Sequence, residues 1–474
     1  MKRIVVVGGG IAGLAAAHRL QTLAQEANTP ISLTLIESAS YLGGKIETER
    51  LDDFVVEGGP DTFLSYKPWG MALCKELGIM DRLHGTNPQK YGSFVMSGTK
   101  LHPLPEGLTG MIPTKFGPMA KTALISPWGK VRMGLDFVLP PRRDEGDESL
   151  ADFISRRLGR EVYARLVEPL MSGIYAGDGE QLSLASTFPQ LRKLELEHGG
   201  LIKGLLSARK NGARRRPAAS KSGLTVFVTP RTGLAELIES LVEHLSDVAL
   251  VTNNGVQAMT PTADGYELTT QDGQKWQADA VIMATPSFAM AKLVDSFDST
   301  LAATLNEIPY VSTATLSVAY PLSDVPHALK GNGYVIPRVE GQDVLACTWT
   351  SSKFPHRAPE GYALLRAFVG RAGREDALDG SDDDLLQLVR AELERTLGIT
   401  AAPMFHRLFR WPDSMPQYNL GHPERLEQID RSLEQHAGLF VAGCAYRGIG
   451  IPDCINSGQQ AARGALDHTS GKDD

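Results

Sequence analysis

The pattern of apolar and polar positions at the start of the chain predicts a strand, a helix and a second strand. Residues 3–7 and 31–37 are runs rich in Val, Ile and Leu, and residues 11–26 between them place apolar side chains on one helical face. Continuous apolar strands around an amphipathic helix are typical of a parallel βαβ unit whose sheet is buried on both faces. We therefore expect a doubly wound sheet in an α/β fold.

Further strands and helices follow along the chain. A hairpin is expected around residues 97–99, and residues 158–170 carry charges between apolar residues at helical spacing. Strands are expected at 248–251, 256–260, 266–269, 280–284, 311–319, 344–350, 362–368 and 439–442, and helices at 382–397 and 453–466. Because these strands are widely spaced, we expect one sheet to be assembled from distant segments.

Composition limits the class of protein. The 474 residues are 42% apolar and 22% charged, which is typical of folded, water-soluble chains, and the formal charge of −7 argues against binding nucleic acid. The apolar run at residues 4–7 is shorter than the roughly 7–15 residues of a signal peptide. No stretch approaches the roughly 20 apolar residues that cross a bilayer. We expect a cytoplasmic protein with at most peripheral membrane contact.

Cysteine and histidine spacing excludes some chemistry. The cysteines are Cys74, Cys347, Cys444 and Cys454. They are too scattered for a disulfide scaffold or a CxxC metal site, and the histidines lack ligand spacing, so no metal is expected. Cys454 has no partner at CxxC spacing, and we expect an apolar residue of the last helix. Residues 209–221 contain six cations and no acid, which predicts a mobile surface loop.

A glycine-rich turn between the first strand and the first helix carries the strongest local signal. It consists of Gly8, Gly9, Gly10, Ile11, Ala12 and Gly13, a GxGxxG motif. Such glycines permit a tight turn, close approach of a pyrophosphate and close helix–strand packing, and the helix N-terminus attracts phosphates. Glu37 ends the second strand 24 residues after Gly13, where it can accept hydrogen bonds from a ribose. We expect a bound dinucleotide.

Later glycine segments indicate which dinucleotide is bound. Leu42-Gly43-Gly44-Lys45 follows Glu37, Gly58-Gly59-Pro60-Asp61 comes after a short strand-like stretch, and residues 448–453 form a third segment near the C-terminus. This order resembles the FAD-binding amine-oxidase-like flavoenzymes. The resemblance implies a Rossmann-like domain that binds FAD, whereas an NAD dehydrogenase would not require these segments.

Four longer segments resemble a narrower family, the oxygen-dependent protoporphyrinogen and coproporphyrinogen oxidases, in their soluble bacterial form. The segments are residues 59–64, 168–178, 411–418 and 450–455. The resemblance implies non-covalent FAD, molecular oxygen as electron acceptor, and removal of six electrons from a porphyrinogen with release of peroxide in haem biosynthesis. It implies no certain catalytic side chain, since flavin N5 accepts the hydride and positioning supplies much of the rate.

The same resemblance implies cofactor contacts at particular positions. Residues 8–13 would meet the pyrophosphate, Glu37 and Ser38 the ribose, and Lys45 the phosphates. The remaining implied contacts lie at the flavin and the adenine: Gly59, Pro60, Asp61, Thr62, Trp411, Ile449, Gly450, Ile451 and, on the adenine side, Val256. Animal and plant relatives often have an arginine where this chain has Asp61, so that residue's carboxylate contact is not expected here.

The expected substrate site is an apolar slot with cationic rims. Rim candidates are Lys67, Arg366 and the 209–221 loop, and wall candidates are Ile174, Tyr175 and Phe368. A solvated surface for Lys67 and the loop, and a core position for Phe368, are the structural alternatives. Coproporphyrinogen carries four carboxylates and protoporphyrinogen two, so a cation-rich mouth favours the former.

The resemblance also divides the chain into three expected domains. Residues 1–60, 222–288 and 405–474 form a discontinuous FAD-binding domain, 61–95, 186–221 and 289–404 a strand-rich substrate-binding domain, and 96–185 a helical insertion. A ferrochelatase-type partner is expected to take the product. Three alternatives stay open: a protoporphyrinogen IX oxidase, an amine oxidase or carotenoid desaturase of the same fold, and a non-catalytic flavin or porphyrin carrier.

Overall fold

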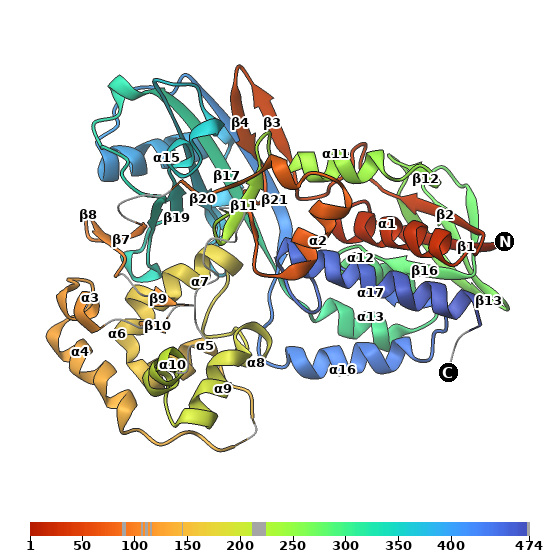
Figure 1. The fold of residues 1–474 in the computed structure, drawn as a ribbon, viewed down its shortest axis with the longest axis horizontal. Helices are drawn as coiled ribbons and strands as arrows, with labels where there is room; N and C mark the ends of the chain where they lie inside the picture. Colours follow the sequence, from red (N-terminus) through yellow and green to blue (C-terminus); the bar gives the residue numbers. More distant parts are fainter. Residues whose placement is uncertain are drawn as a thin grey trace.

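The computed structural model describes residues 1–87, 92–105, 108–109, 112–113, 116–144, 146–210 and 224–471. Two large sheets lie along the long axis of the molecule, and a group of helices packs beside the second sheet (Figure 1). Among the described residues, none of the helices is both long enough and apolar enough to span a bilayer.

The first sheet has five parallel strands in the order β12-β2-β1-β16-β22. These are β1 (Lys2–Val7), β2 (Ile31–Ile36), β12 (Val248–Val251), β16 (Ala280–Met283) and β22 (Leu439–Val441). Its neighbouring strands come from both ends and the middle of the chain, so the prediction that distant segments share one sheet is confirmed. The mixed α/β fold class is confirmed with it.

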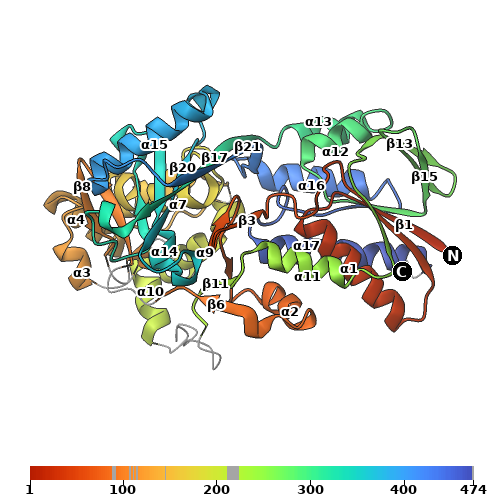
Figure 2. The same cartoon turned by 90° about the horizontal axis from the view of Figure 1, so that it is seen from above.

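Both faces of this sheet are covered, which explains its continuous apolar strands. One face packs on α1 (Ile11–Glu26), α11 (Ala235–Glu243) and α17 (Ile451–Thr469), and the other on α12 (Ser287–Val294), α13 (Ser299–Asn306) and α16 (His422–Leu433) (Figure 2). The antiparallel strands β13 (Val256–Thr262), β14 (Gly265–Thr270) and β15 (Lys275–Ala278) complete the second layer. A Cβ on Gly458 would lie 2.1 Å from the Ala12 carbonyl oxygen, so this glycine permits the close contact of α17 with α1.

The second sheet has seven strands in the order β21-β17-β20-β19-β18-β7-β8. They are β7 (Ser93–Ser97), β8 (Lys100–Pro103), β17 (Tyr310–Pro321), β18 (Gly333–Val335), β19 (Val344–Thr348), β20 (Tyr362–Val369) and β21 (Phe405–Pro416). Helix α15 (Asp382–Leu397) packs its apolar side on this sheet. The predicted hairpin and the predicted limits of α15 are confirmed.

The helices within residues 116–210, which follow β8 in the chain, pack together in a separate cluster. They are α3 (Phe116–Lys121), α4 (Pro127–Gly134), α5 (Leu150–Leu158), α6 (Arg160–Val162), α7 (Glu168–Tyr175), α8 (Leu184–Thr187), α9 (Pro189–His198) and α10 (Leu201–Lys210). The helix predicted over residues 158–170 is interrupted at Gly159, whose φ is +98°, and passes through a π-helical turn at Tyr163–Val167.

The predicted loop at residues 209–221 is corrected at its start. Arg209 and Lys210 are the last two residues of α10, because the helical pattern of residues 201–208 continues into them. Residues 211–221 lie outside the described part of the chain.

Candidate active site

The GxGxxG turn leaves open space in front of α1. Gly10 is the N-cap of this helix, and no side chain of the described residues caps it. A Cβ on Gly10 would meet no described atom within 4 Å, whereas one on Gly13 would lie 1.9 Å from the Gly8 carbonyl oxygen. The space therefore borders Gly10 and the free N–H groups of the first helical turn. A pyrophosphate fits there, because those groups and the helix dipole favour an anion.

Glu37 joins the end of β2 to the same turn. Its Oε2 accepts a hydrogen bond from Gly9 N at 2.6 Å, and its Oε1 accepts from the Ser38 hydroxyl at 3.0 Å. Asn254 N donates to the Glu37 carbonyl at 3.1 Å, which brings the start of β13, with Val256, to this edge. The residues expected at the ribose and the adenine thus lie together at the carboxyl ends of the strands, where doubly wound sheets bind ligands.

The Leu42–Lys45 segment crosses the front of the glycine turn. Gly43 N donates to the Gly9 carbonyl at 2.8 Å, and Gly43 forms an isolated parallel bridge with Gly10. The Lys45 ammonium donates to the Ser414 carbonyl, and its Nζ lies 3.8 Å from Sγ of Cys444. The positive charge of Lys45 therefore lies between this segment and the C-terminal part of the chain.

Three side chains hold the turn at Gly58 and Gly59, which follows β4 (Phe54–Glu57). The Thr315 hydroxyl and the Trp411 indole N–H donate to the Gly58 carbonyl at 2.7 and 2.9 Å. Arg366 donates to the same carbonyl at 3.0 Å and also to that of Gly59. The turn expected at the flavin is thus fixed by β17, β20 and β21, where the first part of the chain meets the second sheet.

Asp61 follows this turn and forms an ion pair. Lys353, the last residue of α14 (Thr350–Lys353), places Nζ 2.7 Å from its Oδ2, and the Thr62 hydroxyl donates at 3.0 Å. Burial opposes ionisation of Asp61, but the charges of Lys353 and Arg366 lower its pKa to about 2. The turn therefore carries an ionised carboxylate, and Lys353 supplies a cation beside it.

The third glycine segment begins α17. Gly450 is the N-cap, Ile449 precedes it and Ile451 opens the helix, so backbone N–H groups of its first turn lie at this point. Tyr418 holds the segment: its hydroxyl accepts from Gly448 N at 2.8 Å and donates to the Cys444 carbonyl at 2.7 Å. The helix dipole favours negative charge at this end of the site.

The residues expected to contact substrate lie in different environments. Lys67 donates to both carboxylate oxygens of Asp453, at 2.7 and 2.5 Å, so its charge is already paired. Ile174 is 47% exposed at the end of α7, while Tyr175 is buried and packs edge-on against Tyr418 at 6.3 Å between ring centroids.

One of these expectations is wrong as to position. Arg366 was expected at a cationic rim, but it is only 2% exposed, because its guanidinium faces the Gly58 and Gly59 carbonyls from within β20. Phe368 is half-buried, and its ring centroid lies 4.8 Å from the Arg366 guanidinium carbon. These two residues are therefore brought together behind the turn.

Several residues of this site escaped the sequence analysis. Lys353 and Thr315 belong to a short helix and a strand without any motif, and they meet the glycine turn only through the tertiary fold. The Cys444 thiol, whose sulfur lies 3.8 Å from Lys45 Nζ, also gave no signal, whereas Cys454 lies in the apolar core, as expected for a residue of the last helix.

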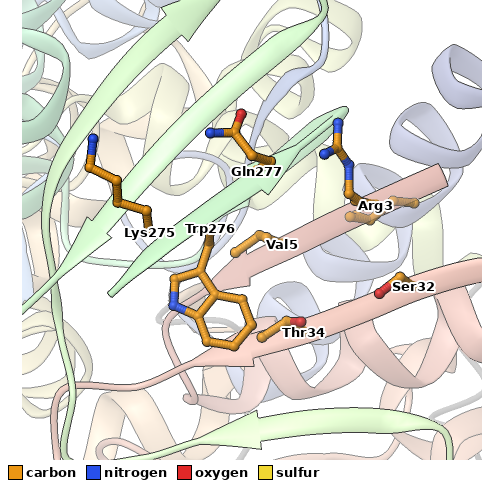
Figure 3. Close-up of a pocket in the computed structure, with 8 residues that line it drawn as sticks. Arg3, Val5, Ser32, Thr34, Lys275, Trp276 and Gln277 are labelled. Atoms are coloured by element: carbon orange, nitrogen blue, oxygen red, sulfur yellow. The ribbon is translucent and has the colours of Figure 1, made fainter. Parts of the chain in front are cut away.

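A cavity of about 200 Å³ lies elsewhere on the first sheet. Figure 3 shows Arg3, Ser32 and Thr34 on neighbouring strands, with the Trp276 indole turned towards Thr34. Arg3 and Ser32 are at the amino ends of β1 and β2, opposite the ends that carry Gly8 and Glu37. Because ligands of doubly wound sheets bind at the carboxyl ends, this cavity is separate from the candidate site.

Comparisons with known proteins agree with this arrangement. The model of a family described as flavin containing amine oxidoreductase matches residues 11–466. The chain is 38% identical over 466 residues to coproporphyrinogen III oxidase of Bacillus subtilis, covering 98% of both chains. It is 34% identical to coproporphyrinogen III oxidase of Staphylococcus aureus, covering 97% of this chain and 98% of that one. A crystal structure of a provisionally named protoporphyrinogen oxidase from Exiguobacterium sp. 255-15 covers 99% of both chains, with a TM-score of 0.86 and 32% identity.

Proposed function

The chain belongs to the flavin-containing amine oxidoreductase family, and from this premise we propose that it is a FAD-dependent coproporphyrinogen III oxidase. The observation that supports this choice of substrate is the likeness to the Bacillus subtilis coproporphyrinogen III oxidase over 98% of both chains. The proposed reaction converts coproporphyrinogen III to coproporphyrin III in three two-electron steps, with oxygen as acceptor and hydrogen peroxide as product.

The residues at the first glycine turn fit non-covalent FAD. The open space at Gly10 and the first turn of α1 would hold the pyrophosphate, and Lys45 would add positive charge to it. The Glu37 carboxylate would accept hydrogen bonds from a ribose at the edge of the sheet. When bound, the flavin supplies hydride acceptance at N5 and passes the electrons to oxygen.

The chain itself contributes position. Arg366, Thr315 and Trp411 fix the turn at Gly58, so the wall proposed to face the flavin is anchored to three strands of the second sheet. A rigid wall holds a substrate carbon in one orientation, and such positioning supplies much of a reaction's acceleration. The pyrrole N–H protons can leave to water, so a general base is not required.

Two lysines of the proposed site each pair with an aspartate. Lys353 lies beside the turn on Asp61, and Lys67 lies at the start of α17 on Asp453, so each charge is already balanced. The likeness to relatives named coproporphyrinogen III oxidase therefore carries the substrate preference. We expect coproporphyrinogen III to be preferred over protoporphyrinogen IX, while a ferrochelatase-type partner and a cytoplasmic location stay predictions.

The test is an aerobic assay of the flavin-loaded protein with each porphyrinogen. Porphyrin fluorescence and peroxide are followed together, and we expect about three peroxide molecules per porphyrin because each two-electron step reduces one oxygen. Equal or faster turnover of protoporphyrinogen IX would reject the preferred substrate. Turnover of an amine without turnover of either porphyrinogen would identify an amine oxidase instead.

A further inference from the structure

A buried tyrosine contacts both the proposed substrate wall and a histidine at the start of α16. Tyr418 follows β21, is 1% exposed, and packs edge-on against Tyr175 at 6.3 Å between ring centroids. It also stacks on the His422 ring, with the centroids 4.2 Å and the planes 11° apart. These two aromatic neighbours restrict the Tyr418 ring to one position.

The loop at residues 444–448, between β22 and α17, is hydrogen-bonded to this stacked pair. The Tyr418 hydroxyl donates to the Cys444 carbonyl at 2.7 Å and accepts from Gly448 N at 2.8 Å. Nε2 of His422 lies 2.9 Å from the Tyr446 carbonyl oxygen. The 444–448 loop is therefore held at its first, third and last residues.

His422 is a neutral donor in this arrangement. It is 1% exposed, and burial lowers its pKa to about 4. A carbonyl oxygen can only accept a hydrogen bond, so the neutral ring carries its hydrogen on Nε2 and donates it to Tyr446. Nδ1 has no hydrogen-bond partner among the described residues. The one donor of the ring is thus directed at the 444–448 loop, while its face supports Tyr418.

The 444–448 loop borders the candidate cofactor site. Lys45 Nζ lies 3.8 Å from the sulfur of Cys444, the first residue of the loop. Two residues before Lys45, Gly43 forms a bridge with Gly10 in front of α1. The loop therefore lies on the side of the site opposite neither glycine turn but next to both the Leu42–Lys45 segment and the start of α17.

The start of α17 extends past the start of α1. Gly458, the eighth residue of α17, packs on Ala12, the second residue of α1. Both helices follow parallel strands of one sheet and cover the same face of it, so they run in the same direction. At 1.5 Å per residue, α17 begins about 9 Å beyond the start of α1. Its first N–H groups thus lie beyond the proposed pyrophosphate position, where the family resemblance implies contact with the flavin.

We propose that Tyr418 and His422 are positioning residues that fix the direction of the first N–H groups of α17 towards the flavin and thereby raise its reduction potential. The inference rests on the proposed function, because it requires FAD in this site. Hydride transfer adds two electrons and one proton, so one negative charge is gained. Backbone N–H groups and the dipole at a helix N-terminus stabilise such a charge. Each residue acts through the 444–448 loop, so neither is a catalytic residue.

Removing the Tyr418 hydroxyl should loosen the loop while the ring stays in place. Tyr418→Phe keeps an aromatic ring against Tyr175 and His422, but the Cys444 carbonyl and the Gly448 N–H lose their partner. The start of α17 is then less firmly directed, and its stabilisation of the added charge weakens. We expect the ratio of reduced to oxidised flavin at a fixed potential to fall about tenfold, which is about 30 mV for a two-electron couple.

Redox titration of the holoenzyme against a dye of known potential measures this shift without any substrate. We expect a lower midpoint potential in Tyr418→Phe and a smaller decrease in His422→Phe, which keeps a stacked ring but removes the donor to Tyr446. Tyr266→Phe is the matched control. The buried Tyr266 also donates to a backbone carbonyl, that of Ala437, at 3.0 Å, but it lies on β14 outside the candidate site. This variant should lose stability and keep the wild-type potential.

Other outcomes would overturn the proposal. A wild-type or higher potential in Tyr418→Phe, or an equal decrease in Tyr266→Phe, would reject it. If Tyr418→Phe does not fold, His422→Phe carries the test, and a wild-type potential in that variant rejects the proposal. Because no substrate is present, the expected shift in a protein that oxidises no porphyrinogen would reject the proposed substrate alone. A wild-type protein that binds no FAD would reject both the proposed function and this inference.

Discussion

Lys353 Nζ lies 2.7 Å from the Asp61 carboxylate, and this ion pair joins the turn after β4 to helix α14 across 292 residues of sequence. The family resemblance implies that many animal and plant members have an arginine at the position of Asp61. In this chain the ion pair places Lys353 beside that position. The pair is largely buried, with 15% of the lysine side chain and 19% of the aspartate side chain exposed. Positive charge at this turn is thus supplied by a different element of the fold.

The pair predicts a pH-dependent contribution to stability. The pKa of Asp61 falls from 3.8 to about 2 in the folded protein, which corresponds to about 2 kcal/mol. Because the folded pKa is the lower one, this stabilisation is present above about pH 5 and is lost as the pH falls towards about 2. We expect Lys353→Met to lower the urea midpoint at pH 7, with a difference from wild type that shrinks on acidification.

The exposed residue Lys330 offers the matched control. Lys330→Met removes the same charge from the surface and should leave the urea midpoint nearly unchanged at every pH. A pH-independent difference for Lys353→Met would contradict the ion-pair account, because it would reflect lost packing instead.

Arg366 is expected to stabilise the fold through its hydrogen bonds as well as through its charge. Arg366→Met removes the donor to the Gly58 and Gly59 carbonyls and the cation near Asp61, and loss of one partner from such a buried group costs about 3–5 kcal/mol. Arg366→Lys keeps the charge but not the planar guanidinium geometry in which one nitrogen donates to both carbonyls, so we expect an intermediate loss. Chemical unfolding measures both, and a Met variant as stable as wild type would contradict the role.

Replacing Gly10 should weaken cofactor binding and leave the fold intact. Its backbone, at φ −72° and ψ 176°, is accessible to alanine, and a Cβ there meets no described atom within 4 Å. The added methyl would instead occupy the space proposed for the pyrophosphate. We expect Gly10→Ala to melt like wild type and to bind FAD about tenfold or more weakly.

Gly134 provides the control for this substitution. It also borders open space, in the last turn of α4 at φ −61°, and lies outside the candidate site. Gly134→Ala should bind FAD as the wild type does. Titration of flavin fluorescence checks both variants, and wild-type affinity in Gly10→Ala would contradict the assigned cradle.

Local signals explain which elements the sequence could predict. The predicted limits of helix α15 coincide with local signals, since Ser381 and Asp384 form a capping box at its start and Gly398 ends it at φ +72°. The strands of the first sheet carry continuous apolar runs because both faces are buried. Gly8 and Glu37 could be placed together because a strand–turn–helix motif fixes their geometry within one unit.

Contacts over long sequence separation could not be predicted in the same way. Arg366 was expected at a rim, since a lone cation in an apolar strand gives no indication that it faces backbone carbonyls 307 residues away. Lys45 and Cys444 lie 399 residues apart in the sequence, and only the tertiary fold shows that the Lys45 ammonium lies beside the Cys444 sulfur. The domain boundaries and the individual cofactor and substrate contacts stay predictions.

Anaerobic mixing of the flavin-loaded protein with coproporphyrinogen III tests the central claim most directly. If the glycine turns hold a flavin that oxidises this substrate, its visible absorbance is lost on mixing and returns when oxygen is admitted, with porphyrin fluorescence appearing in step. An absorbance that stays unchanged would contradict the account and would indicate a carrier rather than an oxidase.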